Sequence, residues 1–304
     1  MPAMNFSPEK ILHQLYEGES KAIARCISIV ENELEGSDFI LQHLQLKKNI
    51  PVVGITGPPG AGKSSLVNLL VKKLIAEEKK IGIIAVDPTS PFNFGSLLGD
   101  RIRLSEHFTS EKVFIRSLAT RGSLGGLSEK IMEVTDVMSS AGFDFIFVET
   151  VGVGQSEVEI AGLADTTVVV LVPEAGDEVQ TMKAGLMEIA DVFVVNKCDR
   201  EQSELFMKNL LLMVHERVSD NEVPVLKTSA ANNEGIDELL RAIENHNKIS
   251  EKNSKRFHLL ANKAIRLIQK KRMSDVDEKK LLEEIKTESE KKDFNIYSFA
   301  KKYF

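Results

Sequence analysis

One short stretch limits the possible folds of this 304-residue chain more than any other feature. It follows the pattern G-x-x-x-x-G-K-S and comprises Gly57, Pro58, Pro59, Gly60, Ala61, Gly62, Lys63 and Ser64, with Ser65 directly after it. Glycines let a backbone wrap a polyphosphate with its N–H groups inward, and the start of a following helix adds partial positive charge. In such loops the lysine reaches the β- and γ-phosphates and the serine hydroxyl ligates Mg²⁺. The stretch therefore predicts a nucleotide triphosphate site.

The surroundings of the motif favour a phosphate loop over the plain tight turn that Gly-Pro-Pro-Gly also forms. The apolar run Pro51–Thr56 predicts a strand before the motif, and Ser65–Leu70 predicts a helix after it. Further apolar runs alternate with amphipathic stretches at Ile81–Val86, Val113–Ser117, Phe143–Val148, Thr167–Val172, Val192–Val195 and Val223–Leu226. Continuous apolar runs are typical of strands that are buried on both faces. The alternation predicts an α/β fold, a P-loop NTPase with a mostly parallel, doubly wound sheet.

Helical patterns flank this region on both sides. Ser7 before Pro8 is a plausible helix start, and apolar residues then recur at helical spacing up to residue 47. We expect an N-terminal helical segment (1–48), a P-loop GTPase domain (49–247) and a C-terminal helical dimerisation segment (248–304). The last segment carries 16 Lys and Arg against nine Asp and Glu, in a chain of net charge −6. Because these charges alternate along predicted helices, a solvated face or a subunit contact is favoured over nucleic acid or membrane.

Composition excludes several classes of protein. Hydrophobic residues make up 42% and charged residues 28%, which is typical of a globular chain. Two cysteines, Cys26 and Cys198, are too few for a disulfide framework or a cysteine-rich zinc site. No apolar run approaches the roughly 18 residues of a membrane span, and the first residues do not resemble a secretory signal. We expect a cytoplasmic protein that binds neither nucleic acid nor membrane.

Three acidic residues are candidates to hold Mg²⁺ together with Ser64. Asp87 and Glu149 each follow directly after a predicted buried strand, and Asp100 lies on the connection between those strands. Any one of them also suits a helix cap or a solvated loop. However, the carboxyl ends of parallel strands meet at one edge of the sheet, which favours a common role at the phosphates. Gly152, shortly after Glu149, is placed to bring a backbone N–H to the γ-phosphate.

A second motif indicates which base is bound. Asn196, Lys197, Cys198 and Asp199 form the pattern N-K-x-D after the run Val192–Val195. A carboxylate in this place accepts from the ring N–H and the amino group of guanine, whereas adenine would leave the same carboxylate, expected to be buried, facing a lone pair. Backbone N–H groups at Ser229, Ala230 and Ala231, after the last predicted strand, are candidates to meet the guanine oxygen. The pair of motifs predicts that GTP and GDP are bound rather than ATP.

Together these motifs resemble one family. The sequence is similar to the MeaB/ArgK group of methylmalonyl-CoA mutase-associated GTPases, which includes the methylmalonic aciduria type A protein. The resemblance runs from about Lys21 to the stretch EVPVLKTSAANNEGIDELL, and its most specific parts are GPPGAGKSS, VDPTSPF, LLGDRIRL, VFIRSLATRGSLGGLS, ETVGVGQSEVEIAGLAD and PEAGDEVQTMKAGLMEIADVFVVNKCDR. One local departure is Phe92–Gly95, where the family usually carries small residues and paired glycines.

The resemblance implies a homodimeric GTPase that gates adenosylcobalamin loading and protects a B12-dependent acyl-CoA mutase of the methylmalonyl-CoA mutase type. It places Lys63, Asp87 and Glu149 among the catalytic residues. It also implies a third switch at Asp177–Lys183, in which Lys183 provides charge toward the active site. Three alternatives remain open: a kinase or ATPase linked to amino-acid transport, a nickel-delivery GTPase of the same fold, and an adaptor switched by nucleotide without catalysis. The sequence does not say which mutase is the partner.

Overall fold

The computed structural model describes residues 7–46, 50–87, 104–119, 130–150, 156–175, 185–217, 223–249, 275–290 and 294–303, with a few positions between 257 and 273. Of Asp87 and of residues 156–159 it describes the backbone alone. The chain divides into two compact units, Met1–Asn253 and Ser254–Phe304. The first unit contains the sheet and both sequence motifs, so it holds the candidate nucleotide site.

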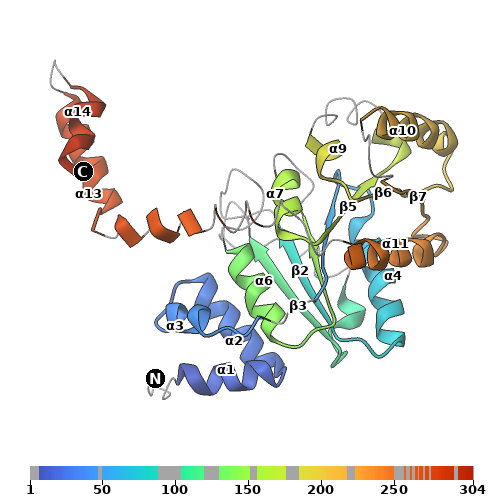
Figure 1. The fold of residues 1–304 in the computed structure, drawn as a ribbon, viewed down its shortest axis with the longest axis horizontal. Coiled ribbons are helices and arrows are strands. Elements are labelled where there is room, and N and C mark those ends of the chain that lie inside the picture. Colours follow the sequence, from blue (N-terminus) through green and yellow to red (C-terminus); the bar gives the residue numbers. More distant parts are fainter. Residues whose placement is uncertain are drawn as a thin grey trace. The chain divides into compact units, whose positions relative to one another are not determined.

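A seven-stranded sheet forms the centre of the first unit, in the order β3-β2-β4-β1-β5-β6-β7 (Figure 1). Every neighbouring pair of strands is parallel. The strands are β1 (Val52–Thr56), β2 (Ile81–Asp87), β3 (Val113–Ala119), β4 (Phe145–Glu149), β5 (Thr166–Leu171), β6 (Val192–Val195) and β7 (Val225–Lys227). The predicted parallel α/β fold is therefore confirmed. Because all carboxyl ends share one edge, the residues after β1, β4, β6 and β7 lie along that edge.

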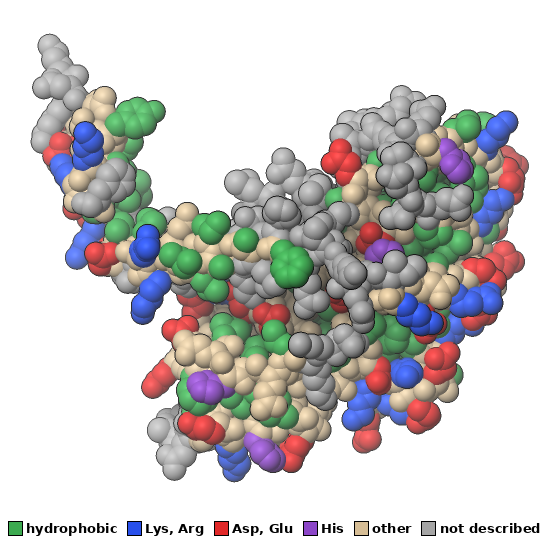
Figure 2. Space-filling model, in the orientation of Figure 1, with side chains coloured by type: hydrophobic (Ala, Val, Ile, Leu, Met, Phe, Trp, Pro, Cys, Tyr) green, Lys and Arg blue, Asp and Glu red, His purple; other side chains and the backbone are tan. Residues whose placement is uncertain are grey.

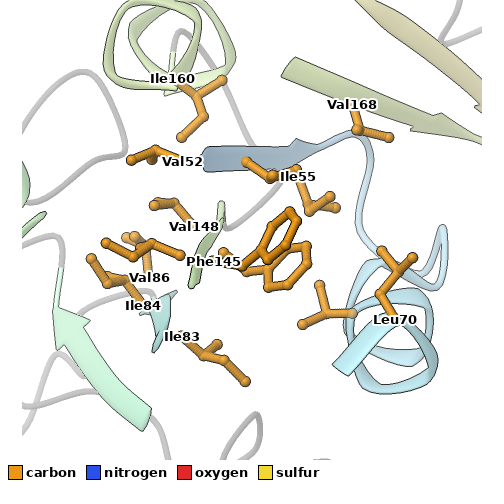
Figure 3. Packing of buried hydrophobic residues seen from close by; sticks show 14 of the residues in the cluster. Val52, Ile55, Leu70, Ile83, Ile84, Val86, Phe145, Val148, Ile160 and Val168 are labelled. Carbon is orange, nitrogen blue, oxygen red and sulfur yellow. The ribbon is translucent and has the colours of Figure 1, made fainter. Parts of the chain in front are cut away.

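Helices cover both faces of this sheet. The helices that connect the strands are α4 (Lys63–Ala76), α6 (Ile131–Ser140), α7 (Ser156–Leu163), α9 (Gly185–Ile189) and α10 (Ser203–Arg217), with the short helices η1 (Ser105–His107) and η2 (Pro173–Ala175). Helix α11 (Ile236–Ile249) follows the last strand. Leu70 of α4 lies on the side of Ile55 and Phe145, whereas Ile160 of α7 lies on the side of Val52 and Val148 (Figure 3). Alternate residues of each central strand thus pack against opposite helical layers, which explains why the strands are continuously apolar.

Three short helices precede the sheet and belong to the same compact unit: α1 (Pro8–Tyr16), α2 (Ser20–Glu31) and α3 (Ser37–Gln42). The Ser7 hydroxyl caps α1 by accepting from the backbone N–H of Lys10 at 3.4 Å. Apolar residues of these helices join the buried core that fills the sheet layers. In addition, Arg116 of β3 forms an ion pair with Glu31 of α2 and donates to the hydroxyl of Ser28. The N-terminal segment is therefore packed onto the sheet domain through both apolar and charged contacts.

The second unit, Ser254–Phe304, contains α13 (Glu278–Ser289), α14 (Ile296–Ala300) and η4 (Lys301–Tyr303). Asp277 caps α13 through the backbone N–H groups of Lys279 and Lys280. Several large apolar side chains of this unit are exposed, among them Leu282 at 53% and Tyr297 at 80%. Figure 2 shows hydrophobic side chains along this segment. Such faces require a further surface to cover them.

Several element boundaries differ from the sequence expectation, among them those of β4, which is Phe145–Glu149 rather than Phe143–Val148. The helix after the phosphate loop begins at Lys63, two residues earlier than predicted, and continues to Ala76. The last strand is Val225–Lys227 rather than Val223–Leu226. Pro224 has no N–H to donate, and its carbonyl accepts from Phe193 before the ladder proper begins. For α4 and β7 part of the element was predicted, and both of its ends were misplaced.

Candidate functional site

The phosphate loop is shaped by close backbone packing that only glycine permits. Gly57 follows β1 with φ +134°, and a Cβ there would collide with the carbonyl of Val170 in β5. Gly62 has φ +90° and caps α4, and a Cβ there would collide with the side-chain amide of Asn196. The loop therefore turns directly from a buried strand into a helix start. A helix start reached this way presents its N–H groups to an anion at the loop.

Lys63 lies inside this loop. Its side chain is buried, and Nζ donates to the carbonyls of Gly57 at 2.8 Å and Pro58 at 3.0 Å. The ammonium group is therefore held within the curve of the loop rather than extended into solvent. This position agrees with the role expected from the sequence, in which a cation meets the terminal phosphates of a nucleotide.

Ser64 and Glu149 meet at the ends of α4 and β4. The hydroxyl of Ser64 donates to Oε1 of Glu149 at 2.6 Å, and both residues are buried, at 3% and 6% exposure. Next to them, the hydroxyls of Thr56 and Thr150 are 2.9 Å apart. A hydroxyl and a carboxylate are the hard oxygen ligands that Mg²⁺ prefers, so the chemistry of this pair fits that ion.

The remaining residues predicted at the phosphates are placed only in part. The backbone of Asp87 ends β2, and β2 pairs directly with β4, the strand that ends at Glu149. Asp100, Gly152 and Lys183 lie outside the described residues. Ser65 is exposed on α4, whereas Ser64 is buried. Among the described residues, no group of three His, Cys, Asp or Glu side chains gathers closely enough to hold a metal.

Asn196 joins the phosphate loop to the second motif. Its Nδ2 donates to the carbonyl of Ala61 at 2.8 Å. Its Oδ1 accepts from the hydroxyl of Thr228 at 3.1 Å and from the backbone N–H of Ala230 at 3.2 Å. One buried side chain thus fixes three segments that are far apart in the sequence. The spacing between the phosphate loop and the loop after β7 is set by these bonds.

Asp199 lies at the exposed end of this arrangement. Lys197 adopts a left-handed backbone with φ +59°, which turns the chain between Asn196 and Asp199. Oδ1 of Asp199 accepts from the hydroxyl of Ser229 at 2.6 Å, while the residue itself is exposed to solvent. The sequence argument treated this carboxylate as buried, and in the structure it is not. Its second oxygen faces no hydrogen-bond partner among the contacts described for it.

Sequence reasoning missed two features of the site. It did not predict that Asn196 bonds to Ala61, because the two residues are separated by 135 positions and only the fold brings them together. It also missed the pair Thr56 and Thr150. A signal for that pair was present, since Thr56 ends one predicted strand and Thr150 follows another, and parallel neighbours bring such positions to the same edge.

Cys198, the variable residue of the second motif, is not an activated nucleophile. Burial raises the pKa of its thiol above the ordinary value, and the nearby charges of Glu234 and Asp199 act in the same direction. A reactive cysteine requires the opposite shift.

The sequence matches a known family over most of its length. The model of the family described as "Methylmalonyl Co-A mutase-associated GTPase MeaB" matches residues 23–287. A Pyrococcus horikoshii protein, whose GTPase description is provisional, is 47% identical over 253 residues, covering 81% of this chain and 80% of that protein. GTPase ArgK of Escherichia coli is 35% identical over 244 residues, covering 76% of this chain and 73% of ArgK.

A third relative differs in architecture. The fused isobutyryl-CoA mutase of Geobacillus kaustophilus is 41% identical over 204 residues, which cover 64% of this chain and 19% of that protein. Among solved structures, a LAO/AO transport system kinase superposes with TM-score 0.70 at 24% identity and covers 100% of this chain and 98% of that one. HypB of Helicobacter pylori, in complex with nickel, gives TM-score 0.53 at 16% identity and covers 69% and 92%. At these identities the two structures support the fold alone.

None of the described helices is long and apolar enough to span a membrane.

Proposed function

This chain is a GTPase of the MeaB family, and we propose that its nucleotide cycle serves a cobalamin-dependent acyl-CoA mutase. Two findings support the proposal. The family description associates its members with methylmalonyl-CoA mutase. A relative described as a fused isobutyryl-CoA mutase is 41% identical to this chain over 204 residues. In that relative the GTPase-like region and a mutase are parts of a single polypeptide. We infer that this chain acts as a chaperone that gates loading of adenosylcobalamin and protects the mutase, in the cytoplasm.

Within that function, Mg²⁺ is the metal that we propose for the phosphate edge. Ser64 and Glu149 are the described residues that would hold it, and we propose Asp87 and Asp100 as further ligands. The ion neutralises charge on the phosphate oxygens when a nucleotide is bound. Gly152 is proposed to donate its N–H to the γ-phosphate.

The residues of the chain itself contribute chiefly by position. Backbone N–H groups of Gly60, Gly62 and Lys63 face an anion at the loop, and Lys63 supplies a fixed positive charge at the β- and γ-phosphates. Because phosphoryl transfer has a largely dissociative transition state, positioning and charge account for most of the rate. Asn196 fixes the distance between the phosphate loop and the loop after β7. Asp199, with Ser229, Ala230 and Ala231, is proposed to select guanine.

A second reading starts from the names of other relatives. The LAO/AO transport system kinase suggests a kinase linked to amino-acid transport, and HypB in complex with nickel suggests nickel delivery. The structural neighbours are below 25% identity, and the relative with the fused mutase is far closer in sequence. Transfer of phosphate from labelled GTP or ATP to a periplasmic binding protein, without any effect of a mutase, would favour the kinase reading.

Stimulation by the mutase is the direct test of the proposal. GTP turnover should rise when a cognate B12-dependent mutase is added, because a partner that positions one cation on the transition state accelerates a slow GTPase by several orders of magnitude. We propose Lys183, in the segment Asp177–Lys183, as that cation. Lys183→Ala should spare intrinsic turnover and nucleotide affinity but remove the stimulated increment. The measurement is phosphate release with and without methylmalonyl-CoA or isobutyryl-CoA mutase.

The matched control is Lys80→Ala, which removes an exposed lysine just before β2, at the opposite edge of the sheet from the phosphate loop. This variant should respond to the mutase as the wild type does. Stimulation that persists in Lys183→Ala would remove that residue from the mechanism. No stimulation of the wild type by either mutase, together with no co-purification, would contradict the proposed function itself.

We further propose that the chain is a homodimer and that residues 248–304 form part of its interface. The exposed apolar side chains of this segment, including Ile265, Leu267 and Leu282, support the proposal. Removing residues 248–304 should give a monomer, and Leu282→Glu should weaken the dimer. Light scattering across a range of concentrations measures both effects. A truncated protein that is folded and still dimeric would exclude the segment from the interface.

A further inference from the structure

His107 belongs to a polar cluster that the nucleotide site described above does not use. It ends η1 and is only 5% exposed. Its Nε2 contacts Oδ1 of Asn68 on α4. Asn68 donates its amide to Glu106, and Glu106 also pairs with Lys72 at 2.9 Å. Two residues of η1 thus contact two residues of α4.

The proton arrangement of this cluster follows from its chemistry. A carboxylate only accepts hydrogen bonds, so the NH₂ group of Asn68 must face Glu106 and its oxygen must face His107. Nε2 of His107 therefore carries a proton and donates it. Burial lowers the pKa of His107, and Lys72 lowers it further, while Glu106 and the bond to Asn68 oppose the shift. At neutral pH the imidazole is neutral, with its proton on the nitrogen that contacts Asn68.

The position of Asn68 on α4 links this cluster to the phosphate edge. Ser64, Asn68 and Lys72 are spaced four residues apart, so they lie along one face of the helix. The first of them contacts Glu149 at the end of β4, and the other two contact η1. One face of α4 is therefore held at its first turn by β4 and at its second and third turns by η1. A helix fixed at several turns has little freedom to rotate about its axis.

We propose that His107 is a positioning residue for GTP hydrolysis, which acts through Asn68 to fix the rotation of α4 and so keep Ser64 directed at Glu149. Glu106 and Lys72 complete the contact between η1 and the helix. This role concerns intrinsic GTP turnover and requires no partner, so its test does not depend on the proposed association with a mutase.

The test compares variants at His107 by turnover and by binding. His107→Met keeps the volume but removes the donor, and it should lower kcat by about tenfold with a smaller change in KM, since a shift of about 1 Å at a catalytic group costs up to about a hundredfold. His107→Gln places a donor where Nε2 was and should restore most of the loss. Calorimetry of GDP binding with and without Mg²⁺ gives a measurement apart from activity. We expect Mg²⁺ to increase the affinity for GDP less in His107→Met than in the wild type.

A second variant and a control make the test independent of folding defects at the buried histidine. Asn68→Ala removes the acceptor at a half-buried helix position where alanine is well tolerated, and it should reproduce the loss in kcat. Lys73→Met removes the neighbouring lysine, which pairs with Asp237 of α11 instead, and it should leave kcat within about twofold of the wild type. Wild-type kcat in Asn68→Ala, or a His107→Gln variant as impaired as a folded His107→Met, would overturn the proposal.

Discussion

Replacing Asp199 by asparagine should lower the affinity of the chain for GDP by about a hundredfold, or about 3 kcal/mol, because a charge-assisted bidentate pair with guanine is lost. The exposed carboxylate of Asp199 already accepts from Ser229 through one oxygen. An amide in its place presents an NH₂ group to the donors of guanine. Titration calorimetry with GDP, in the presence of Mg²⁺, measures the change.

A second nucleotide and a control variant test whether the effect is specific to the base. Xanthine carries a carbonyl where guanine carries its amino group, so Asp199→Asn should bind xanthosine diphosphate more tightly than the wild type does. Asp237→Asn makes the same chemical change on the exposed surface of α11, and its affinity for GDP should stay at the wild-type value. If the wild type bound ATP and GTP equally well, the assignment of the base would be wrong.

Lys63→Met should reduce GTP turnover by about a thousandfold, the upper range for removing one preorganised electrostatic group from an active site. The buried ammonium group sits between the carbonyls of Gly57 and Pro58, and no other described lysine lies within the phosphate loop. Methionine keeps much of the side-chain volume without the charge. Single-turnover phosphate release measures the loss. Lys73→Met, which changes the same residue type on the same helix outside the loop, serves as its control.

Replacing any of the three acidic residues proposed to hold Mg²⁺ should also lower GTP turnover. Glu149→Ala removes the carboxylate that accepts from Ser64, and turnover at a fixed Mg²⁺ concentration should fall, while binding of the guanine base is retained. Asp87→Ala and Asp100→Ala should act in the same direction. If all three variants hydrolysed GTP at the wild-type rate, the proposed magnesium ligands would be wrong.

Much of the fold was predictable because buried parallel strands leave a clear pattern. β1, β4 and β5 are buried along their whole length, and each appears in the sequence as an uninterrupted apolar run. Strand ends were less predictable, because they depend on the register with neighbours. The start of β7 is one such case, since Pro224 is held by β6 before regular pairing begins. The start of helix α4 was also misplaced, because its N-cap is Gly62, which lies inside the phosphate loop.

The candidate site was predictable where its residues form a motif of consecutive positions in the sequence. The loop around Lys63 and the tetrad that ends at Asp199 follow that rule. Contacts between distant segments were not predictable: Asn196 bonds to Ala61, and His107 bonds to Asn68, only because the fold brings loops and helices from separate parts of the chain together. The exposure of Asp199 was also missed, since burial at the rim of a site depends on how the surrounding loops are arranged rather than on residue type.

The packing of the N-terminal helices has a practical consequence for anyone shortening this protein. β3 lies at the edge of the sheet and pairs with β2 alone among the described strands, and its Arg116 is neutralised by Glu31 of α2. A recombinant chain that starts at residue 49 would leave a guanidinium without its carboxylate and would uncover apolar surface beside an open strand edge. Edges of this kind recruit strands from other molecules and cause aggregation. Crystallisation and calorimetry are therefore best attempted with residues 7–46 retained.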